Sequence, residues 1–241
     1  MAEDIRLEKN VFDSPKEQKP TPPPDSDAAH PVGKLLDARF GLILPTERAF
    51  IFGILSSLGS RFIRAVEIGT WRGTTMHVIR RACDELYCID PMPQWIWDPS
   101  IVTRSGKPVQ LITGYSPADL CRIPAPFTFV FVDGDHSKNG VYYDAKALES
   151  LMEPGGVICF HDGNHPPVQE GLFQAEFEWK RERKFYHLAC DTISRTPEGV
   201  FGGLSVIVVE PGASPVAGFS IPAPLPASQE RLTPFALRKS R

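Results

Sequence analysis

Acidic and histidine side chains follow two apolar runs of the sequence, at the point where each run ends. Asp133 and His136 come after one run, and His161 and Asp162 after another. If the two runs are neighbouring parallel strands, both carboxylates stand at one edge of the sheet, where a divalent cation such as Mg²⁺ would offset their repulsion. His161 would add a nitrogen ligand, which favours Mn, Fe or Zn. A neutral His136 suits a general base.

Two other interpretations of these residues concern structure or a different metal site. Asp133, Asp135 and His136 are also compatible with a capped turn that leads into the following helix. His161 and His165 have a spacing that binds zinc when both lie on a helix, but the glycine and prolines around them favour a loop. We therefore expect the first arrangement, with Asp133, His161 and Asp162 as metal ligands.

A glycine-containing segment runs from Glu67 to Thr75 after an earlier apolar run. Gly69 allows a sharp turn and a close ligand, and Gly73 opens a helix whose free N–H groups face that ligand. The segment lacks the third glycine of the dinucleotide motif and the lysine of the P-loop. Glu67 places a carboxylate beside the loop, which suits a cationic ligand, although an ordinary strand–helix turn is the alternative.

Two further strand ends carry polar residues. Asp90 lies 21 residues after Gly69, and an acid at this place can accept hydrogen bonds from both hydroxyls of a ribose. Ser116 belongs to the turn after the third run, which either flanks an adenine or is a plain loop.

These residues need a sheet that brings the ends of the apolar runs together. The runs are continuous rather than alternating, which indicates strands buried on both faces, and helical stretches separate several of them. We predict an α/β fold with a doubly wound, mostly parallel sheet whose last two strands are antiparallel. The seven expected strands span 61–69, 85–90, 109–113, 127–134, 155–162, 184–189 and 203–210.

Helices are expected between or before these strands, over 45–58, 74–82, 140–152 and 166–183. The last of these ends in the charged run 180–183, which is expected to be a solvated face.

The motifs E-I-G-x-x-x-G-x-T, V-D-G-D-H-S and P-G-G-V-I-x-F-H-D together resemble class I S-adenosylmethionine-dependent methyltransferases. Within that class the chain is similar to the branch with macrolide-sugar, cephalosporin and rhamnosyl O-methyltransferases. The resemblance covers about residues 45–210 and implies a seven-stranded Rossmann-like sheet. It implies S-adenosylmethionine and a divalent metal, with Mg²⁺ expected, as cofactors.

The resemblance also assigns roles to residues. Glu67, Gly69 and Gly73 line the methionine part of the cofactor, and Asp90 holds the ribose. Asp133 and Asp162 match the metal-binding positions, His161 stands where the macrolide enzymes have an acid, and His136 matches their proposed base. The expected cofactor-binding set is Glu67, Gly69, Thr70, Gly73, Asp90, Ser116 and Asp133.

The composition limits the partners of the chain. A net charge of -3 and a pI of about 6.1 give no basic field for nucleic acid. No apolar run is long enough to span a membrane, and the first residues lack a secretory pattern. We expect a cytoplasmic enzyme with reduced cysteines that acts on a small-molecule hydroxyl acceptor, binds neither nucleic acid nor membrane, and forms a homodimer.

The expected domain organisation is a proline-rich disordered arm over 1–30, a methyltransferase domain over 31–211 and a proline-rich extended tail over 212–241. Trp95 and Trp97, in a proline-flanked loop, are expected either to cover the acceptor or to pack on the core. The alternatives are a metal-independent methyltransferase and a non-catalytic S-adenosylmethionine-binding module. The missing glycine disfavours a nicotinamide-dependent oxidoreductase.

Overall fold

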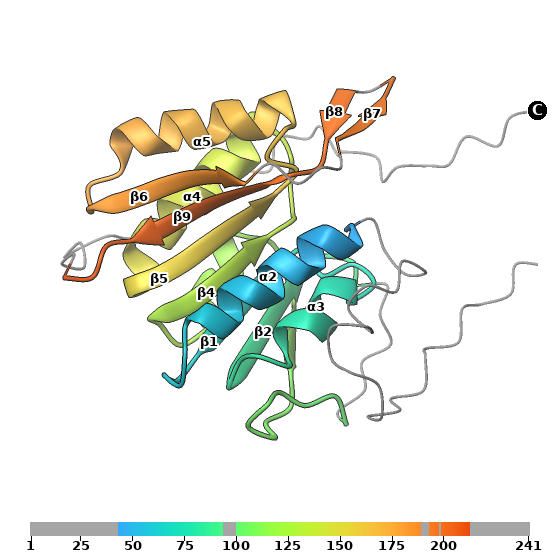
Figure 1. The fold of residues 1–241 in the computed structure, drawn as a ribbon, viewed down its shortest axis with the longest axis vertical. Coiled ribbons are helices and arrows are strands. Elements are labelled where there is room, and N and C mark those ends of the chain that lie inside the picture. Colours follow the sequence, from blue (N-terminus) through green and yellow to red (C-terminus); the bar gives the residue numbers. More distant parts are fainter. Residues whose placement is uncertain (1–42, 94–99, 189–192, 198, 213–241) are drawn as a thin grey trace, which may run out of the picture.

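A computed structural model describes residues 43–93, 100–188, 193–197 and 199–212. Its centre is a seven-stranded sheet with the order β3-β2-β1-β4-β5-β9-β6 (Figure 1). The strands are β1 (Arg64–Ile68), β2 (Glu85–Asp90), β3 (Gln110–Thr113), β4 (Phe127–Val132), β5 (Met152–His161), β6 (Arg183–Leu188) and β9 (Leu204–Val209), and a separate hairpin comprises β7 (Ser194–Thr196) and β8 (Gly199–Phe201).

Five helices accompany the strands in the described part of the chain. They are α2 (Pro45–Ser57), α3 (Thr74–Ile79), the 3₁₀ helix η1 (Ala118–Arg122), α4 (Lys138–Leu151) and α5 (Pro166–Glu178). None of these helices is long and apolar enough to cross a lipid bilayer.

The central strands of the sheet are buried on both faces, as their continuous apolar runs predict. All six residues of β4 are buried. On one face, Leu148 of α4 and Leu172 of α5 belong to the same core cluster as Val130. On the other face, Ile51 of α2 and Met76 of α3 join the cluster that contains Phe129. The predicted doubly wound α/β fold is therefore confirmed.

The strand pairing also agrees with the sequence prediction. Strands β1 to β5 pair in parallel, while β9 is antiparallel to both β5 and β6. Strand order reverses between β1 and β4, because the chain runs outward to β3 on one side and to β5 on the other. In an open α/β sheet, a ligand binds at the carboxyl ends of the strands at such a reversal.

The prediction of a solvated charged run at 180–183 is wrong for Arg181, while Lys180 and Glu182 are exposed as expected. Helix α5 already ends at Glu178, and Arg181 is only 3% exposed. Its guanidinium donates to the carbonyl oxygens of Glu149 and Met152, both at 2.7 Å. These carbonyls lie at the end of α4, where backbone acceptors lack helical partners, and they offset part of the cost of burying the cation.

Several of the expectations concern residues that the structure does not describe. The arm over 1–30, Trp95, Trp97, Cys190 and nearly all of the tail lie outside the described residues. Cys83, Cys88 and Cys159 are buried free thiols and Cys121 is an exposed one.

Candidate active site

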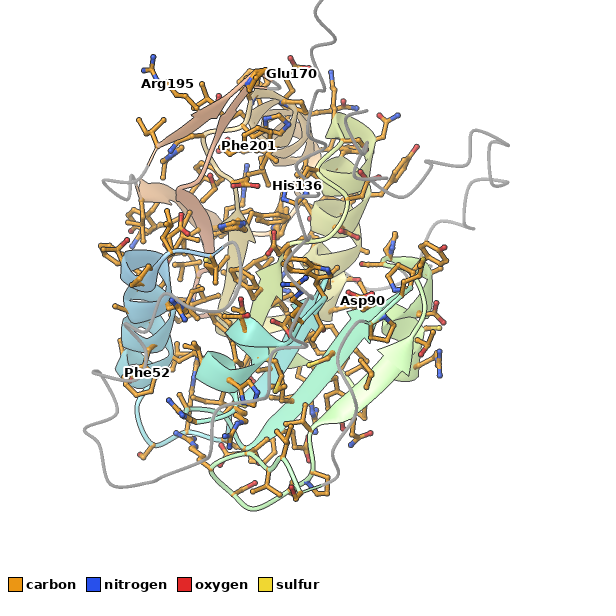
Figure 2. All side chains as sticks on the ribbon, turned by 90° about the vertical axis from the view of Figure 1, so that its right-hand side faces the viewer. Phe52, Asp90, His136, Glu170, Arg195 and Phe201 are labelled. Atoms are coloured by element: carbon orange, nitrogen blue, oxygen red, sulfur yellow. The ribbon has the colours of Figure 1, made fainter. Side chains whose placement is uncertain are left out.

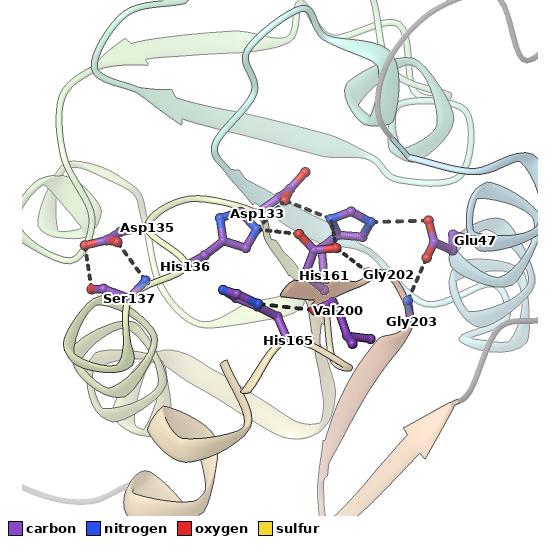
Figure 3. A network of polar contacts seen from close by, with 11 residues as sticks. Glu47, Asp133, Asp135, His136, Ser137, His161, His165, Val200, Gly202 and Gly203 are labelled. Atoms are coloured by element: carbon purple, nitrogen blue, oxygen red, sulfur yellow. Dashed lines mark hydrogen bonds and ion pairs between the residues drawn. The ribbon is translucent and has the colours of Figure 1, made fainter. Parts of the chain in front are cut away.

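Four polar side chains gather at the carboxyl ends of β4 and β5. Asp133, His136, His161 and Asp162 each offer one ligand atom, and these atoms all lie within 4.8 Å of one another. The register of the two parallel strands pairs Val132 with Phe160, so the residues that follow each strand end side by side. The cluster expected from the sequence is therefore assembled in the fold (Figure 3).

His161 is held on both sides of its ring. Its Nδ1 lies 3.0 Å from Oδ1 of Asp133 and its Nε2 lies 3.2 Å from Oε2 of Glu47. Burial disfavours the charged ring, but the two carboxyl groups outweigh it and raise the pKa of His161 well above its usual value. His161 is therefore a buried cation when no metal ion takes the place of its proton.

Sequence reasoning missed Glu47. This residue lies in the first turn of α2, is completely buried, and also accepts hydrogen bonds from the backbone N–H groups of Leu44 and Gly203, at 2.9 Å each. The one acidic residue of the helix PTERAFIFGILSS was the available signal. Its partners lie up to 156 residues away, so no local pattern reveals them.

His136 lies between the two aspartates. Its Nε2 is 3.2 Å from Oδ1 of Asp133 and 3.1 Å from Oδ2 of Asp162. Burial opposes the charge, yet the contacts with both carboxylates raise the pKa of His136 to about 10. Conversely, His161 and His136 overcome the effect of burial on Asp133 and lower the pKa of its carboxyl to about 2.

The donor set fits a divalent cation. Two carboxylates and two imidazoles converge, and Glu47 holds the far nitrogen of His161 in the way that carboxylates hold metal-binding histidines. Nitrogen donors suit Mn, Fe or Zn better than Mg²⁺, which prefers oxygen ligands. The structure thus places Asp133, His161 and Asp162 together as expected and adds His136 as a fourth potential ligand.

The turn after His136 has the capping role that the structural alternative predicted. Asp135 accepts from the backbone N–H of Ser137 at 2.8 Å, and the Ser137 hydroxyl accepts from the N–H of Gly140 at 3.0 Å. Asp135 thereby orders the start of α4, while Asp133 and His136 face the cluster. The capping interpretation therefore holds for Asp135 and Ser137, whereas Asp133 and His136 belong to the polar cluster.

Gly69 fixes the glycine loop beside the cluster. Its φ is +84°, and a Cβ added there would lie 2.1 Å from the carbonyl oxygen of Asp133. The close neighbour that demands a glycine is thus the end of β4. Gly73, with φ of +76°, precedes the first turn of α3 as predicted.

Glu67 lies in the core next to the loop. Its side chain is buried, and Cys88 donates its S–H to Oε2 of Glu67 at 3.4 Å. Desolvation raises the pKa of Glu67 to about 8, against the lowering effect of this hydrogen bond. The buried carboxyl is therefore mostly neutral at pH 7, whereas the sequence indicated a charged group beside the ligand.

Asp90 lies at the carboxyl end of β2 (Figure 2). Its Oδ2 accepts from the N–H of Trp71 and its Oδ1 from the N–H of Met92, both at 2.7 Å. These bonds fix the orientation of the carboxylate, which retains acceptor capacity for ligand hydroxyls because each oxygen has two lone pairs.

A single cavity of about 900 Å³ connects these features. This volume lies within the usual range for small-molecule and cofactor sites. Of the residues expected at the site, Glu67 and Gly73 do not line it. The others do: Gly69, Thr70, Asp90, Ser116, Asp133, His136, His161 and Asp162.

Comparison with known families gives the same result as the motifs. Residues 66–163 match a family model described as a methyltransferase domain. The matched part of the chain is therefore similar to a methyltransferase domain. The matched range begins in β1 and ends just after Asp162, so it includes the glycine loop and the whole Asp/His cluster but not Glu47. The resemblance drawn from the motifs is therefore confirmed.

Solved structures share the fold of this chain at low sequence identity. An O-methyltransferase from Bacillus cereus in complex with S-adenosylhomocysteine is 19% identical, with a TM-score of 0.52, over 75% of this chain and 87% of that one. A putative O-methyltransferase from Klebsiella pneumoniae is 15% identical, with a TM-score of 0.51, over 75% and 90%. The precorrin 8w decarboxylase from Methanobacterium thermoautotrophicum is 18% identical, with a TM-score of 0.52, over 70% and 92%.

A search of curated proteins finds no match to the sequence. The structural likenesses, all below 20% identity, establish the fold of the domain.

Proposed function

We propose that the chain transfers the methyl group of S-adenosylmethionine to a hydroxyl oxygen of a small molecule. The observation that carries this proposal is the single cavity, which is lined by Asp90 and Gly69 as well as by Asp133 and His136. A cofactor held through its ribose at Asp90 would direct its sulfonium towards the strand-order reversal, where the polar cluster lies. The structure of the Bacillus cereus O-methyltransferase with S-adenosylhomocysteine supports this choice of cofactor.

The transfer is an in-line displacement. The acceptor oxygen forms a bond to the methyl carbon, the bond from that carbon to sulfur breaks, and S-adenosylhomocysteine leaves with the electron pair. Most of the catalytic effect would come from holding the oxygen and the methyl carbon in line at close distance. His136 would take the hydroxyl proton at Nε2. Because Asp133 and Asp162 raise the pKa of this ring to about 10, the neutral form that accepts a proton requires further positive charge beside the two carboxylates.

Asp133, His161 and Asp162 would hold a divalent cation next to the acceptor. A bound cation lowers the pKa of a coordinated hydroxyl. The chain contributes the fixed orientation of these ligands, because Glu47 restrains His161 and the N–H of Gly202 donates to Oδ1 of Asp162 at 2.6 Å.

Metal-independent methyl transfer is the second candidate. The ion pairs of the cluster favour it, because His136 and His161 already provide positive charge beside Asp133 and Asp162. In that case, the histidines rather than a metal ion would stabilise the aspartates, and catalysis would depend on alignment of the two substrates.

Calorimetric titration of the full chain with S-adenosylhomocysteine, with and without Mg²⁺ or Mn²⁺, tests the proposal. We expect micromolar binding, followed by methyl transfer from S-adenosylmethionine to members of a panel of sugars, phenols and catechols. Absence of binding under every condition contradicts the proposed function.

The Asp133→Asn variant separates the two candidates. If a cation takes part, this variant loses metal-stimulated transfer but keeps its affinity for S-adenosylhomocysteine within about threefold. Asp135→Asn is the matched control, because it removes a carboxylate two residues away that caps α4 and lies outside the cluster. Transfer that is equally fast in metal-free wild type supports the metal-independent candidate.

A further inference from the structure

A buried carboxyl at the edge of the cavity has no role in the function proposed above. Asp144, on α4, is only 2% exposed and lines the cavity. The hydroxyl of Ser116 donates to its Oδ1 at 2.5 Å. Among the described residues, Oδ2 of Asp144 has no hydrogen-bond partner. An acceptor on the wall of a cavity is available to a ligand, because a carboxylate oxygen has lone pairs for more than one hydrogen bond.

The position of Asp144 relative to Asp90 indicates which part of a ligand it faces. Asp90 pairs with Thr113 in the register of β2 and β3, so the turn that contains Ser116 follows immediately beside Asp90. Across the sheet, the strands follow one another in the order β4, β1, β2 and β3. A nucleoside whose ribose lies at Asp90, with its reactive end at Asp133, therefore extends its base towards Ser116 and Asp144.

The electrostatics of Asp144 agree with this position. Desolvation raises the pKa of Asp144 to about 7, and the hydrogen bond from Ser116 offsets only part of that effect. No described cation pairs with the carboxyl, and the one charge that acts on its pKa, that of Asp135, is also negative. A hydrogen-bond donor supplied by a ligand would satisfy the vacant oxygen.

We propose that Asp144, oriented by Ser116, recognises the 6-amino group of the cofactor's adenine through its Oδ2. This inference rests on the proposed function, which supplies the adenine nucleoside. An ionised carboxylate only accepts hydrogen bonds, and the amino group donates them. A purine with an oxygen at position 6 would place two acceptors next to each other in a desolvated site. A site built to accept from a donor discriminates strongly against such a ligand.

The test compares S-adenosylhomocysteine with S-inosylhomocysteine, in which an oxygen replaces the 6-amino group of the purine and N1 carries a hydrogen. Calorimetry on the full chain at pH 8 should show that wild type binds the amino compound at least about tenfold more tightly, the value of one well-placed hydrogen bond. In Asp144→Asn, the amide can donate to the oxygen. We therefore expect this variant to bind the amino compound more weakly and to lower the ratio of the two affinities to about threefold or less.

Asp135→Asn is the matched control, because it removes a negative charge near Asp144 without touching the Asp144–Ser116 pair. Its affinity ratio should equal that of wild type. If Asp144→Asn does not fold, as judged by thermal unfolding, the Ser116→Ala variant tests the proposal instead. That variant keeps the carboxylate but loses its restraint, and its affinity ratio should fall by about threefold or more.

The outcomes distinguish the inference from the function on which it rests. Wild type that binds neither compound contradicts the proposed function and the inference with it. Wild type that binds S-adenosylhomocysteine, together with variants at position 144 or 116 that retain the full ratio, overturns the role of Asp144 and leaves the cofactor assignment intact.

Discussion

The two histidines of the site contact the same aspartates but differ in solvent exposure and in how firmly their rings are held. The side chain of His161 is 6% exposed and Glu47 holds its far nitrogen, whereas that of His136 is 34% exposed and only the two aspartates hold it. A group that accepts a proton from a substrate has to approach that substrate. We therefore assign the base to His136 and the orientation of the cluster to His161.

Replacement of His136 by alanine tests this assignment. We expect kcat to fall by about 10²–10⁴-fold, the usual contribution of a positioned general base, while the affinity for S-adenosylhomocysteine changes by less than about threefold. Steady-state kinetics and calorimetry provide the two values. His187→Ala, on the exposed strand β6, is the control and should retain wild-type kcat. A His136→Ala variant with near-normal kcat would show that the ring is structural.

The raised pKa of Glu67 predicts how the free energy of unfolding changes with pH. Its carboxyl has an ordinary pKa of 4.5 when unfolded and about 8 when folded, so the folded state binds more protons between these values. The contribution of Glu67 to stability is thus most favourable below pH 4.5 and declines as pH rises towards 8. Glu67→Gln removes this decline. Its free energy of unfolding should rise relative to wild type by at most about 1.4 kcal/mol per pH unit across that window.

Urea unfolding at pH 5.5, 6.5 and 7.5 measures the effect. Glu85→Gln gives the opposite behaviour, because hydrogen bonds from Lys107 and Arg64 lower the pKa of Glu85. Its stabilising contribution is present above pH 4.5 and disappears in acid, so the variant is less stable than wild type at neutral pH. An unchanged pH dependence in Glu67→Gln would mean that the carboxyl reaches solvent.

At the scale of elements, α2 is part of the site as well as of the core. Ile51 and Leu55 pack this helix on the sheet, and Glu47 in its first turn contacts His161 and the backbone before β9. The helix lies outside the matched family range of 66–163. We infer that the packing of α2 determines how rigidly His161 is held.

Glu47→Ala is expected to lower the free energy of unfolding by about 2–4 kcal/mol. The change leaves two backbone N–H groups and a ring nitrogen of His161 without their buried acceptor. Urea unfolding measures the loss. Ser57→Ala, at the exposed end of the same helix, should cost less than about 0.5 kcal/mol. A Glu47→Ala variant as stable as Ser57→Ala would contradict the proposed link between α2 and the site.

At the scale of the molecule, the sequence predicted the sheet and most of the site because their signals are local. Each central strand is a continuous apolar run, and Asp90, Asp133 and Asp162 directly follow such runs. Glu47, Asp144 and the buried Arg181 were not predicted, since each acquires its role from partners that are distant in sequence. The hairpin β7–β8 was missed for another reason: its strands have only three residues each, too few for a periodic pattern.

The contact between Glu47 and Gly203 has a consequence for the synthesis of the chain. The two residues are separated by 156 positions, and His161 lies between them in sequence. A chain that has left the ribosome only as far as β5 has the complete Asp/His cluster but lacks one of the donors that hold Glu47. The cluster can therefore reach its final geometry only after Gly203 has emerged, so completion of the active site is a late event in folding.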